Sequence, residues 1–500
     1  MGPIDTIGNI PENLDELFPP GLSPDRRARA RTLFLKKLSL AAHRQYGGKM
    51  QTLPRCALPS RDWLDVWYTP GVSAVSTTIR DAALGRAAAA GGPGAAEDPS
   101  FELSARGNTV AVVSDSTRVL GDGDCTPSGG LGVMEGKAFL MKYLGGVDAV
   151  PLCVDSRLGA AEPDPDNLIR FVRMAQASFG AVNLEDISQP NCFRVLDELQ
   201  DCEIPVWHDD AQGTAAVTLA GLLNALKLAG KELSEARIVL LGAGAANSTT
   251  ARFILAAGGD PGRLVLADKE GCLHSGRADL ESDPRAYRQW ELARSTNPRR
   301  LASVAEAVRG ADALVALSAP GPGTVKPEWV ASMAERSIVF ACANPVPEIW
   351  PHAAKEAGAF IVATGRGDFP NQVNNSVCFP GLLKGVLLAR ARRVTDAMAI
   401  RAARSLASFA ERRGIGPESI MPTMDETEVF AIEAAEVAEE AEAEGLARRP
   451  IPRAEAYARA KADAEAARSL FRRMQEEGYI PAPDPALVQA ALREALAETE

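Results

Sequence analysis

Two pairs of adjacent carboxylates carry the strongest chemical signal in this sequence of 500 residues. Glu185 and Asp186 end one apolar run, and Asp209 and Asp210 end another that begins at Ile204. Buried strands would bring both pairs to one edge of a sheet, where adjacent carboxylates repel each other unless a cation or a proton compensates them. An oxygen-rich site of this kind suits Mg²⁺ or Mn²⁺. The sequence therefore predicts a divalent-metal site with four equivalent candidate ligands.

Lys137 and Tyr68 are the candidate base and acid. Lys137 is flanked by glycines at the start of an apolar helix, and a lysine beside a bound cation and away from water has a lowered proton affinity, which suits a general base. Tyr68 precedes a Pro-Gly turn, and a phenol held near a lysine can donate a proton. Taken alone, Lys137 is more often a surface lysine and Tyr68 a core aromatic residue.

Five further polar residues follow predicted strands. Arg118 can clamp a carboxylate through its two-pronged donor geometry. The amides of Asn344 and of the pair Asn374 and Asn375 can hydrogen-bond a small polyoxygenated substrate, although each asparagine alone is more often a turn or capping residue. His208 precedes the second acidic pair, but strand alternation points it away from its acidic neighbour, so we interpret it as structural.

A glycine-rich turn between a strand and a helix predicts a dinucleotide site. Gly242 permits the tight turn, and Gly244 lets backbone N–H groups and the helix N-terminus approach a pyrophosphate. Asn247 stands where the fingerprint has a third small residue, so the helix packs differently on its strand there. The alternative is a glycine turn without a ligand. The predicted cofactor-binding residues here are Gly242, Gly244, Ala245, Ala246 and Asn247, with Asn344 from a later loop.

The choice between NAD and NADP depends on the end of the next strand. Asp268 lies about where an acidic residue accepts a ribose hydroxyl in this kind of site. Lys269 beside it could instead serve the 2′-phosphate of NADP. The sequence thus favours NAD only weakly, and both cofactors stay open.

These candidates must be positioned by an alternation of strands and helices that begins at Thr109. Such alternation is typical of a parallel sheet covered by helices, and a second series follows the helix predicted over 215–228. The predicted fold class is α/β, with an N-terminal α/β domain for substrate and metal, a Rossmann-type NAD(P)-binding domain and a helical C-terminal region. The predicted strands are 109–114, 149–154, 181–184 and 204–207 in the first series, and 237–241, 263–267, 313–316, 337–341 and 359–363 in the second.

The predicted boundaries divide the chain into four segments. The first is a helical, loop-rich leader, with a helix from Pro24 to Gln45 capped by Ser23 and a flexible segment over 85–99. The charged C-terminal helices read as solvated surfaces, with subunit contacts as the alternative. The four segments are the leader over 1–105, the catalytic α/β domain with the metal site over 106–214, the Rossmann-type domain over 215–378 and the helical region over 379–500.

Composition excludes several classes of protein. The formal charge of −11 argues against a general nucleic-acid-binding surface and favours a small-molecule partner. Eight scattered cysteines fit a reducing compartment, and no segment has the pattern of a signal peptide or a membrane span. We therefore expect a cytoplasmic protein without a membrane partner.

Taken together, the order of these segments resembles the malic enzymes, the decarboxylating malate dehydrogenases. The resemblance runs from about residue 41 to 388, and the chain departs from the family pattern at Gly121–Thr126 and at Asn247. Together the motifs are far more specific than any one of them. They are Tyr68-Thr-Pro-Gly-Val, Met134-Glu-Gly-Lys, Leu184-Glu-Asp, His208-Asp-Asp-Ala-Gln-Gly-Thr-Ala, Leu317-Ser-Ala-Pro, Cys342-Ala-Asn-Pro and Phe369-Pro-Asn-Gln-Val-Asn-Asn.

The resemblance implies a role for each candidate. It separates Asp209, which supports the lysine, from the other three acidic residues, which bind the metal. It implies metal ligation by Glu185, Asp186 and Asp210, a base at Lys137, an acid at Tyr68, and substrate contacts from Arg118, Asn344 and Asn375.

The implied reaction is the oxidative decarboxylation of L-malate to pyruvate and CO₂, with hydride passing to NAD⁺ or NADP⁺ and with Mg²⁺ or Mn²⁺ as the metal. One alternative is a malolactic enzyme, which has the same fold but converts malate to lactate. A nucleotide-sensing protein without catalysis is a second alternative, which the presence of both Lys137 and Tyr68 disfavours. The resemblance also implies a homodimer or a larger homo-oligomer.

Overall fold

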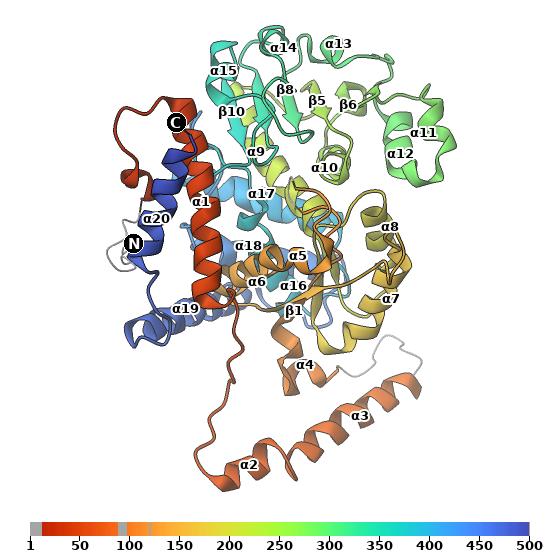
Figure 1. Ribbon diagram of the computed structural model, residues 1–500. Helices are drawn as coiled ribbons and strands as arrows, with labels where there is room; N and C mark the ends of the chain where they lie inside the picture. Colours follow the sequence, from red (N-terminus) through yellow and green to blue (C-terminus); the bar gives the residue numbers. More distant parts are fainter. Residues whose placement is uncertain (1–12, 89–97, 120–121, 500) are drawn as a thin grey trace. The chain divides into compact units, whose positions relative to one another are not determined.

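The computed structural model describes residues 13–88, 98–119 and 122–499 (Figure 1). They form two compact units, one that joins both ends of the chain, up to Arg55 and from Glu465 onward, and one that contains residues 56–464. None of the described helices is both long and apolar enough to cross a membrane. The predicted α/β class, with a Rossmann-type domain and a helical C-terminal region, is confirmed, whereas the boundaries predicted for the domains stay predictions.

The terminal unit is built on α1 (Pro24–Tyr46) and α20 (Pro485–Ala497), which pack together. The hydroxyl of Ser23 accepts the N–H of Arg26 at 3.3 Å, so the predicted cap is confirmed and the helix ends one residue beyond the predicted Gln45. Phe34 is fully buried in the small core that α1 shares with α20.

The first sheet has four parallel strands in the order β2-β1-β3-β4. Every residue of β1 and β3 is buried, as expected of strands covered by helices on both faces. The predicted fourth strand is wrong at its start, since Pro205 has no N–H to donate and the strand begins at Val206. The elements are β1 (Thr109–Ser114), β2 (Asp148–Cys153), β3 (Ala181–Leu184), β4 (Val206–His208), α4 (Ser100–Leu103), α5 (Thr126–Gly129), α6 (Leu131–Gly145), α7 (Pro165–Ala175) and α8 (Asn191–Glu198).

The second sheet has six strands in the order β10-β9-β8-β5-β6-β7, and only β7 runs antiparallel. The chain leaves β5 on one side for β6 and returns on its other side as β8, which creates the switch point where this fold binds dinucleotides at the carboxyl ends of the strands. The elements are β5 (Ile238–Leu241), β6 (Leu264–Asp268), β7 (Gly271–Cys272), β8 (Ala313–Ala316), β9 (Ile338–Ala341), β10 (Ile361–Thr364), α9 (Thr214–Ala229), α10 (Ala245–Ala256), α11 (Ala278–Ser282), α12 (Tyr287–Ser295), α13 (Val304–Val308), α14 (Pro327–Ala331) and α15 (Pro351–Glu356).

Two helices, α2 (Arg61–Trp67) and α3 (Val72–Ala88), precede the first sheet and lie apart from both sheets in Figure 1. The flexible segment predicted over 85–99 begins later than expected, because the alanine-rich residues up to Ala88 continue α3. The rest of that predicted segment, 89–97, falls outside the described residues.

The C-terminal helices pack closely because glycines face their neighbours. A Cβ at Gly385 on α16 would lie 2.4 Å from the carbonyl oxygen of Ala434, and one at Gly381 would lie 2.2 Å from Oε2 of Glu433. The glycines therefore let α16 approach α18 and leave Glu433 fully buried between them. The elements are α16 (Phe379–Leu388), α17 (Asp396–Arg413), α18 (Glu428–Ala443) and α19 (Arg453–Glu476).

Substitution of Glu433 by glutamine is expected to flatten the dependence of stability on pH. Burial raises the pKa of Glu433 well above its usual range, so the folded state holds a proton that the unfolded state releases. The stability that this bound proton contributes is complete below the pKa of Glu433 in the unfolded state, and it is lost as pH rises through the pKa in the folded state. The neutral amide of Glu433→Gln has no proton to lose over this range. In thermal unfolding measured from pH 5 to pH 8, the Tm of Glu433→Gln should rise relative to that of the wild type as pH rises.

Glu436 provides the matched control on the same helix. Burial raises the pKa of Glu436, but hydrogen bonds and ion pairs with Arg453 and Arg401 outweigh it, and the net pKa is lowered. Its contribution is therefore present above the unfolded pKa, so Glu436→Gln should lose stability at neutral pH and lose least in acid. The same trend in both variants would contradict the account of Glu433.

Candidate active site

The two acidic pairs meet at one edge of the first sheet. Strands β3 and β4 are neighbours, with Leu184 in register with His208, so the residues that follow them emerge side by side. One carboxylate oxygen from each of Glu185, Asp186 and Asp210 lies within 4.8 Å of the others. The structure thus brings the three predicted metal ligands together, in a geometry that suits a hard divalent cation.

The second acidic pair lies on a single π-helical turn, Asp209–Gly213, which points its two side chains in different directions. Asp210 turns toward the first pair, and its Oδ2 accepts the backbone N–H of Asp186 at 2.7 Å. Asp209 turns the other way, where Oδ1 accepts the indole N–H of Trp207 at 3.2 Å and Oδ2 accepts from Lys137. Such turns recur at functional sites because they redirect neighbouring side chains. The four carboxylates are therefore not equivalent.

Lys137 lies between the two groups of carboxylates. It projects from α6, with Nζ 3.0 Å from Oε1 of Glu185 and in contact with Asp209. The ammonium also lies 4.5 Å from the ring centroid of Phe379, and 11% of the side chain is exposed. The predicted base is therefore a largely buried lysine rather than a surface one.

The electrostatics of the cluster favour the binding of a cation. Burial raises the pKa of Glu185 well above its usual range, and the nearby carboxylates of Asp210, Asp209 and Asp186 raise it further against the opposing charge of Lys137. Burial alone would lower the pKa of Lys137, but the surrounding carboxylates raise it. One ammonium is too little charge for four clustered carboxylates, and a divalent cation would relieve the excess.

His208 is fully buried beside this cluster, as predicted for a structural residue. Burial lowers its pKa, so the imidazole stays neutral, with Nδ1 3.9 Å from Oδ2 of Asp210. The side chain therefore adds no charge to the site.

Gly213 and Asn375 complete the wall around Asp209. A Cβ at Gly213 would lie 1.9 Å from Oδ1 of Asp209 and 3.4 Å from Cβ of Asn375. Asn374 instead caps a short 3₁₀ helix, where its side chain accepts the N–H of Ser376 at 2.9 Å. Of the two candidate asparagines, the structure places Asn375 next to the acidic cluster and gives Asn374 a capping role.

Arg118 reaches the cluster through its backbone. Its N–H donates to the carbonyl oxygen of Asp186 at 3.0 Å, and its side chain is exposed. The preceding turn is held by Asp115, which accepts from the hydroxyls of Thr117 and Ser156 at 2.7 and 2.9 Å. The loop is thus well anchored, and the contact of Arg118 with a substrate carboxylate stays a prediction.

Tyr68 is not brought to the cluster. It follows α2, the residue is 68% exposed, and Figure 1 shows α2 well separated from α6, which carries Lys137. It is also not the core aromatic residue of the alternative interpretation. The predicted acid and the predicted base lie on separate parts of this chain.

The glycine turn has the geometry of a dinucleotide fold. Gly242 has φ +98°, and a Cβ there would lie 2.4 Å from the carbonyl oxygen of Leu317, so no other residue fits this close approach. Gly244 is the N-cap residue of α10, and a Cβ added there would meet nothing nearer than Oε1 of Gln189 at 3.7 Å. The space beside Gly244 at this helix N-terminus is therefore open, as pyrophosphate binding requires, and contacts from Ala245 and Ala246 stay a prediction.

Asn247 has a structural role, hydrogen bonding to two strands, that its position in the motif did not predict. The side chain is fully buried, and Nδ2 donates to the carbonyl oxygens of Leu241 at 2.9 Å and Val315 at 3.4 Å. The amide thus ties α10 to both strands at the switch point. A small residue could not make these bonds.

Asp268 ends β6 as predicted, but it has a partner that sequence analysis missed. Arg277 donates to both carboxylate oxygens, at 3.1 and 2.8 Å, and also to Asp279 at 2.7 Å. Lys269 is 90% exposed. Arg277 follows the hairpin of β7, and its distance in sequence from the fingerprint left no signal to find it.

Glu348 is a second residue that sequence analysis missed. It is fully buried, and its carboxylate accepts the N–H of Ser318 at 2.8 Å and that of Ala343 at 3.0 Å. It thereby fastens the loop after β8 to the loop after β9, next to Asn344. Asn344 itself is exposed, with Nδ2 2.8 Å from the Cβ position of Gly365.

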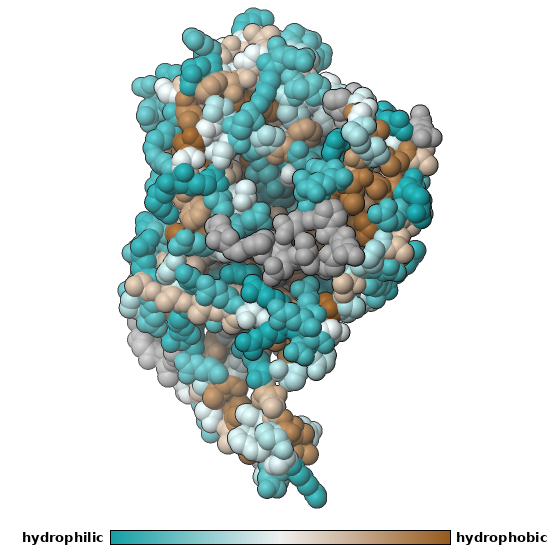
Figure 2. Space-filling view, turned by 90° about the vertical axis from the view of Figure 1, so that its left-hand side faces the viewer, coloured by the Kyte–Doolittle hydropathy of each residue, from teal (hydrophilic) through white to brown (hydrophobic). Residues whose placement is uncertain are grey.

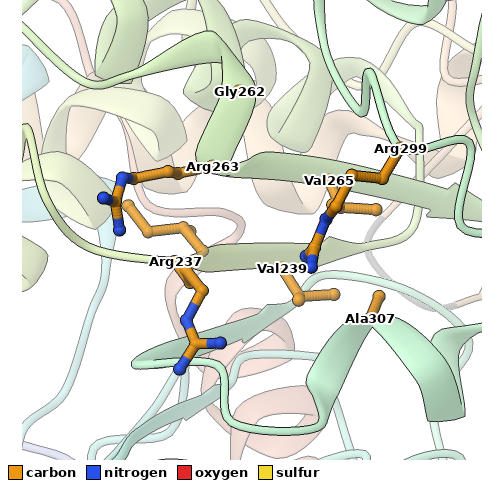
Figure 3. Close-up of a pocket in the computed structure, with 8 residues that line it drawn as sticks. Arg237, Val239, Gly262, Arg263, Val265, Arg299 and Ala307 are labelled. Carbon is orange, nitrogen blue, oxygen red and sulfur yellow. The ribbon is translucent and has the colours of Figure 1, made fainter.

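A pocket of about 210 Å³ lies elsewhere in the same domain (Figure 3). It is lined by Arg237, Arg263 and Arg299, and it lies at the amino ends of β5 and β6. The glycine turn and Asp268 lie at the carboxyl ends of these strands. The pocket is therefore distinct from the candidate cofactor site.

Comparison with known proteins agrees with this geometry. The family model described as malic enzyme, N-terminal domain matches residues 47–200, and the one described as malic enzyme, NAD binding domain matches residues 211–442. The chain is 41% identical over 407 residues to an NAD-dependent malic enzyme of Geobacillus stearothermophilus, which covers 81% of this chain and 78% of the relative. It is 37% identical over 416 residues to a bifunctional malic/malolactic enzyme of Bacillus subtilis, which covers 83% and 95%.

The crystal structure of Entamoeba histolytica malic enzyme is similar over 98% of both chains, with a TM-score of 0.92 and 54% sequence identity. The acidic cluster, the buried lysine, the glycine turn and these similarities agree, and the chain belongs to the malic enzyme family.

Proposed function

We propose that the protein catalyses the oxidative decarboxylation of L-malate to pyruvate and CO₂ with reduction of a nicotinamide cofactor. The observation that carries this proposal is the acidic trio Glu185, Asp186 and Asp210, with carboxylate oxygens within 4.8 Å of one another and Lys137 beside Glu185. These residues would hold Mg²⁺ or Mn²⁺. When bound, the cation supplies positive charge that polarises a carbonyl and stabilises an enolate, while the nicotinamide accepts hydride.

Lys137 is the proposed base. It takes the proton of the C2 hydroxyl as hydride leaves C2, which converts malate to oxaloacetate. Without the cation, the carboxylates raise the pKa of Lys137, and positive charge held by the trio would work against that rise. Asp209 positions the ammonium through its direct contact.

Tyr68 is the proposed acid. After loss of CO₂, C3 of the enolate takes a proton from the phenol, and the enolate becomes pyruvate. The substrate has by then given one proton to Lys137 and taken one from Tyr68. Transfer of one proton from Lys137 to Tyr68 therefore restores both groups, which requires that they come together in the working site.

Arg118, Asn344 and Asn375 are the proposed substrate contacts. An arginine on the anchored loop suits a substrate carboxylate, and the amides suit its other oxygens.

All eight cysteines have free thiols, which supports a reducing compartment such as the cytoplasm.

The test supplies purified protein with L-malate, Mn²⁺ and either NAD⁺ or NADP⁺. Pyruvate and reduced cofactor should appear in equal amounts, EDTA should abolish turnover, and added Mn²⁺ should restore it. Lactate without net reduction would identify a malolactic enzyme, and binding of the nucleotide without turnover would identify a silent sensor. Either result would overturn the proposal.

We further propose NAD⁺ as the preferred cofactor, because the carboxylate of Asp268 would repel a 2′-phosphate and occupies Arg277. Asp268→Ala should release Arg277 to bind that phosphate. The ratio of kcat/KM for NADP⁺ to that for NAD⁺ should rise roughly tenfold or more, since a charged hydrogen bond contributes about 1.5–3 kcal/mol and 1.4 kcal/mol is tenfold.

The other carboxylate on Arg277 gives the control for this cofactor prediction. Asp279 pairs with Arg277 at 2.7 Å but does not end the strand beside the glycine turn. Asp279→Ala should leave the cofactor preference unchanged in steady-state kinetics. An equal change in both variants would show that Asp268 does not set the preference.

A further inference from the structure

Three arginines surround the pocket at the amino ends of β5 and β6 (Figure 3). Arg237 directly precedes β5, Arg263 directly precedes β6, and Arg299 comes from the segment between α12 and α13. Guanidinium groups gathered at one place repel one another unless an anion compensates them. The pocket is therefore a candidate site for an anion.

The floor of this pocket is apolar and well packed. Val239 and Val265 lie in register on neighbouring strands and are 1% and 6% exposed, and Ala307 on α13 is 7% exposed. All three belong to one hydrophobic core of the domain. At the top of Figure 2, the height at which α13 and α14 lie in Figure 1, the surface is mostly hydrophilic. An apolar floor under a cationic rim is thus a local feature of this domain.

Gly310 makes room for the side chain of Arg237. Gly310 has φ +66°, and a Cβ there would lie 3.0 Å from Nη2 of Arg237. The backbone N–H of Arg237 donates to Oδ2 of Asp312 at 2.7 Å, while Oδ1 of Asp312 pairs with Lys231 at 2.7 Å. This carboxylate is therefore already paired with another cation.

Arg263 is held by two contacts. Its Nη1 donates to the carbonyl oxygen of Glu235 at 2.8 Å, and its Nε lies 3.4 Å from Oδ2 of Asp260. The carboxylate of Glu306, on the helix beside the floor, accepts two backbone N–H groups just before α13, both at 3.2 Å. Of the acidic groups near the pocket, only Asp260 thus pairs with an arginine of the rim.

Positive charge exceeds negative charge at the rim. Within the described part of the chain, Arg263 has an ion-pair partner, whereas Arg237 and Arg299 have none. Figure 3 shows Arg299 reaching over Val265 toward the floor. In a chain whose formal charge is −11, this local surplus of two guanidinium groups matches an anion with two negative charges.

We propose that this pocket binds a small phosphate monoester, with the phosphate group on the three arginines and the organic part over Val239 and Val265. A phosphate monoester carries close to two negative charges at neutral pH. Its tetrahedral oxygens point in several directions and can accept from arginines of three separate segments, whereas a planar carboxylate suits the fork of a single arginine.

The size of the pocket limits the ligand. Its volume of about 210 Å³ equals the share of about seven water molecules in the liquid, at about 30 Å³ each. That is more space than a bare phosphate fills and less than a dinucleotide needs, so a short ester fits best.

This site is separate from the cofactor site and goes beyond the proposed reaction. Arg237 precedes the pocket end of β5, and Gly242 of the glycine turn comes five residues later. At about 3.3 Å per residue, a strand of that length spans about 17 Å. The ester therefore binds without contact to the glycine turn, and the protein can hold both ligands at once.

Isothermal titration calorimetry of the full-length protein tests this proposal, with phenyl phosphate and inorganic phosphate as the two probes. The nicotinamide cofactor is kept saturating and EDTA removes divalent metal, so that neither probe occupies the glycine turn or a metal in the acidic trio. We expect one site per chain, at which phenyl phosphate binds roughly tenfold more tightly than inorganic phosphate, because its ring covers the apolar floor. Absence of saturable binding, or inorganic phosphate that binds as tightly as the ester, would overturn the proposal.

Three single variants locate the binding. Arg237→Gln and Arg299→Gln should each weaken phenyl phosphate roughly tenfold, since a hydrogen bond between charged groups is worth about that factor. Arg300→Gln is the matched control, because Arg300 is exposed beside Arg299 but does not line the pocket, and its affinity should stay within about twofold of the wild type.

Thermal unfolding of each variant without ligand verifies that the compared proteins are folded. Malate turnover should match the wild type in all three variants, because the pocket lies apart from the candidate active site. A failure of the binding prediction therefore leaves the proposed function untouched. Equal affinity for phenyl phosphate in the wild type, Arg237→Gln and Arg299→Gln would place the bound ester elsewhere and contradict the proposal.

Discussion

Lys137→Ala is expected to lower kcat by about 10²–10⁴-fold, the usual contribution of a general base, while the protein stays folded. The side chain contacts both Asp209 and Glu185 and is the ammonium nearest to the three proposed metal ligands among the described residues. Its loss removes the proton acceptor for the C2 hydroxyl but leaves the cofactor site intact. Initial rates at saturating malate and Mn²⁺, with a binding titration of the cofactor, measure the two effects separately.

Lys142 is the matched control on the same helix. Its Nζ pairs with Asp148 at 2.8 Å, and the residue lies on α6 without contact to the acidic cluster. Lys142→Ala should keep kcat within about twofold, because partly exposed pairs of this kind contribute little. Comparable losses in the two variants would mean that α6 tolerates no change and that Lys137 has no special role.

Gly213→Ala is expected to cost about 10²-fold in kcat, a loss typical of a catalytic group displaced by about 1 Å. The new Cβ would lie 1.9 Å from Oδ1 of Asp209, so Asp209 would have to leave its contacts with Lys137 and Trp207. Affinity for the nicotinamide should change little. Steady-state rates and cofactor binding measure this prediction.

Gly416→Ala serves as the control for the added methyl group, since a Cβ there would meet nothing within 4 Å and the residue has no positive φ. Its activity should match the wild type. Normal turnover of Gly213→Ala would show that the position of Asp209 does not matter to catalysis.

Sequence analysis predicted the parallel strands of both sheets within one or two residues, because buried parallel strands are continuous apolar runs, and it missed the short antiparallel β7 (Gly271–Cys272). It also predicted that the two acidic pairs lie at one edge of the sheet, since residues that follow neighbouring parallel strands share an edge, and three of the four carboxylates do cluster there. The split of Asp209 from Asp210 came only from the resemblance. The π-helical turn that points the two side chains in different directions leaves no repeating pattern in the sequence.

What the sequence could not provide depends on contacts between distant segments. Glu348 and Arg277 belong to no motif, yet one fastens two loops and the other pairs with Asp268. The motif at Tyr68 predicted an acid that works with Lys137, whereas the structure places Tyr68 at an exposed position after α2, and its role as the acid stays a prediction.

The most direct test of the account follows deuterium from C2 of L-malate during turnover with Mn²⁺ and NAD⁺. We predict that the label leaves on the reduced nicotinamide, one equivalent for each pyruvate formed, and that its release slows by about 10²–10⁴-fold in the Lys137→Ala variant. Deuterium retained at C2 of lactate, or label released at the same rate without Lys137, would contradict the account.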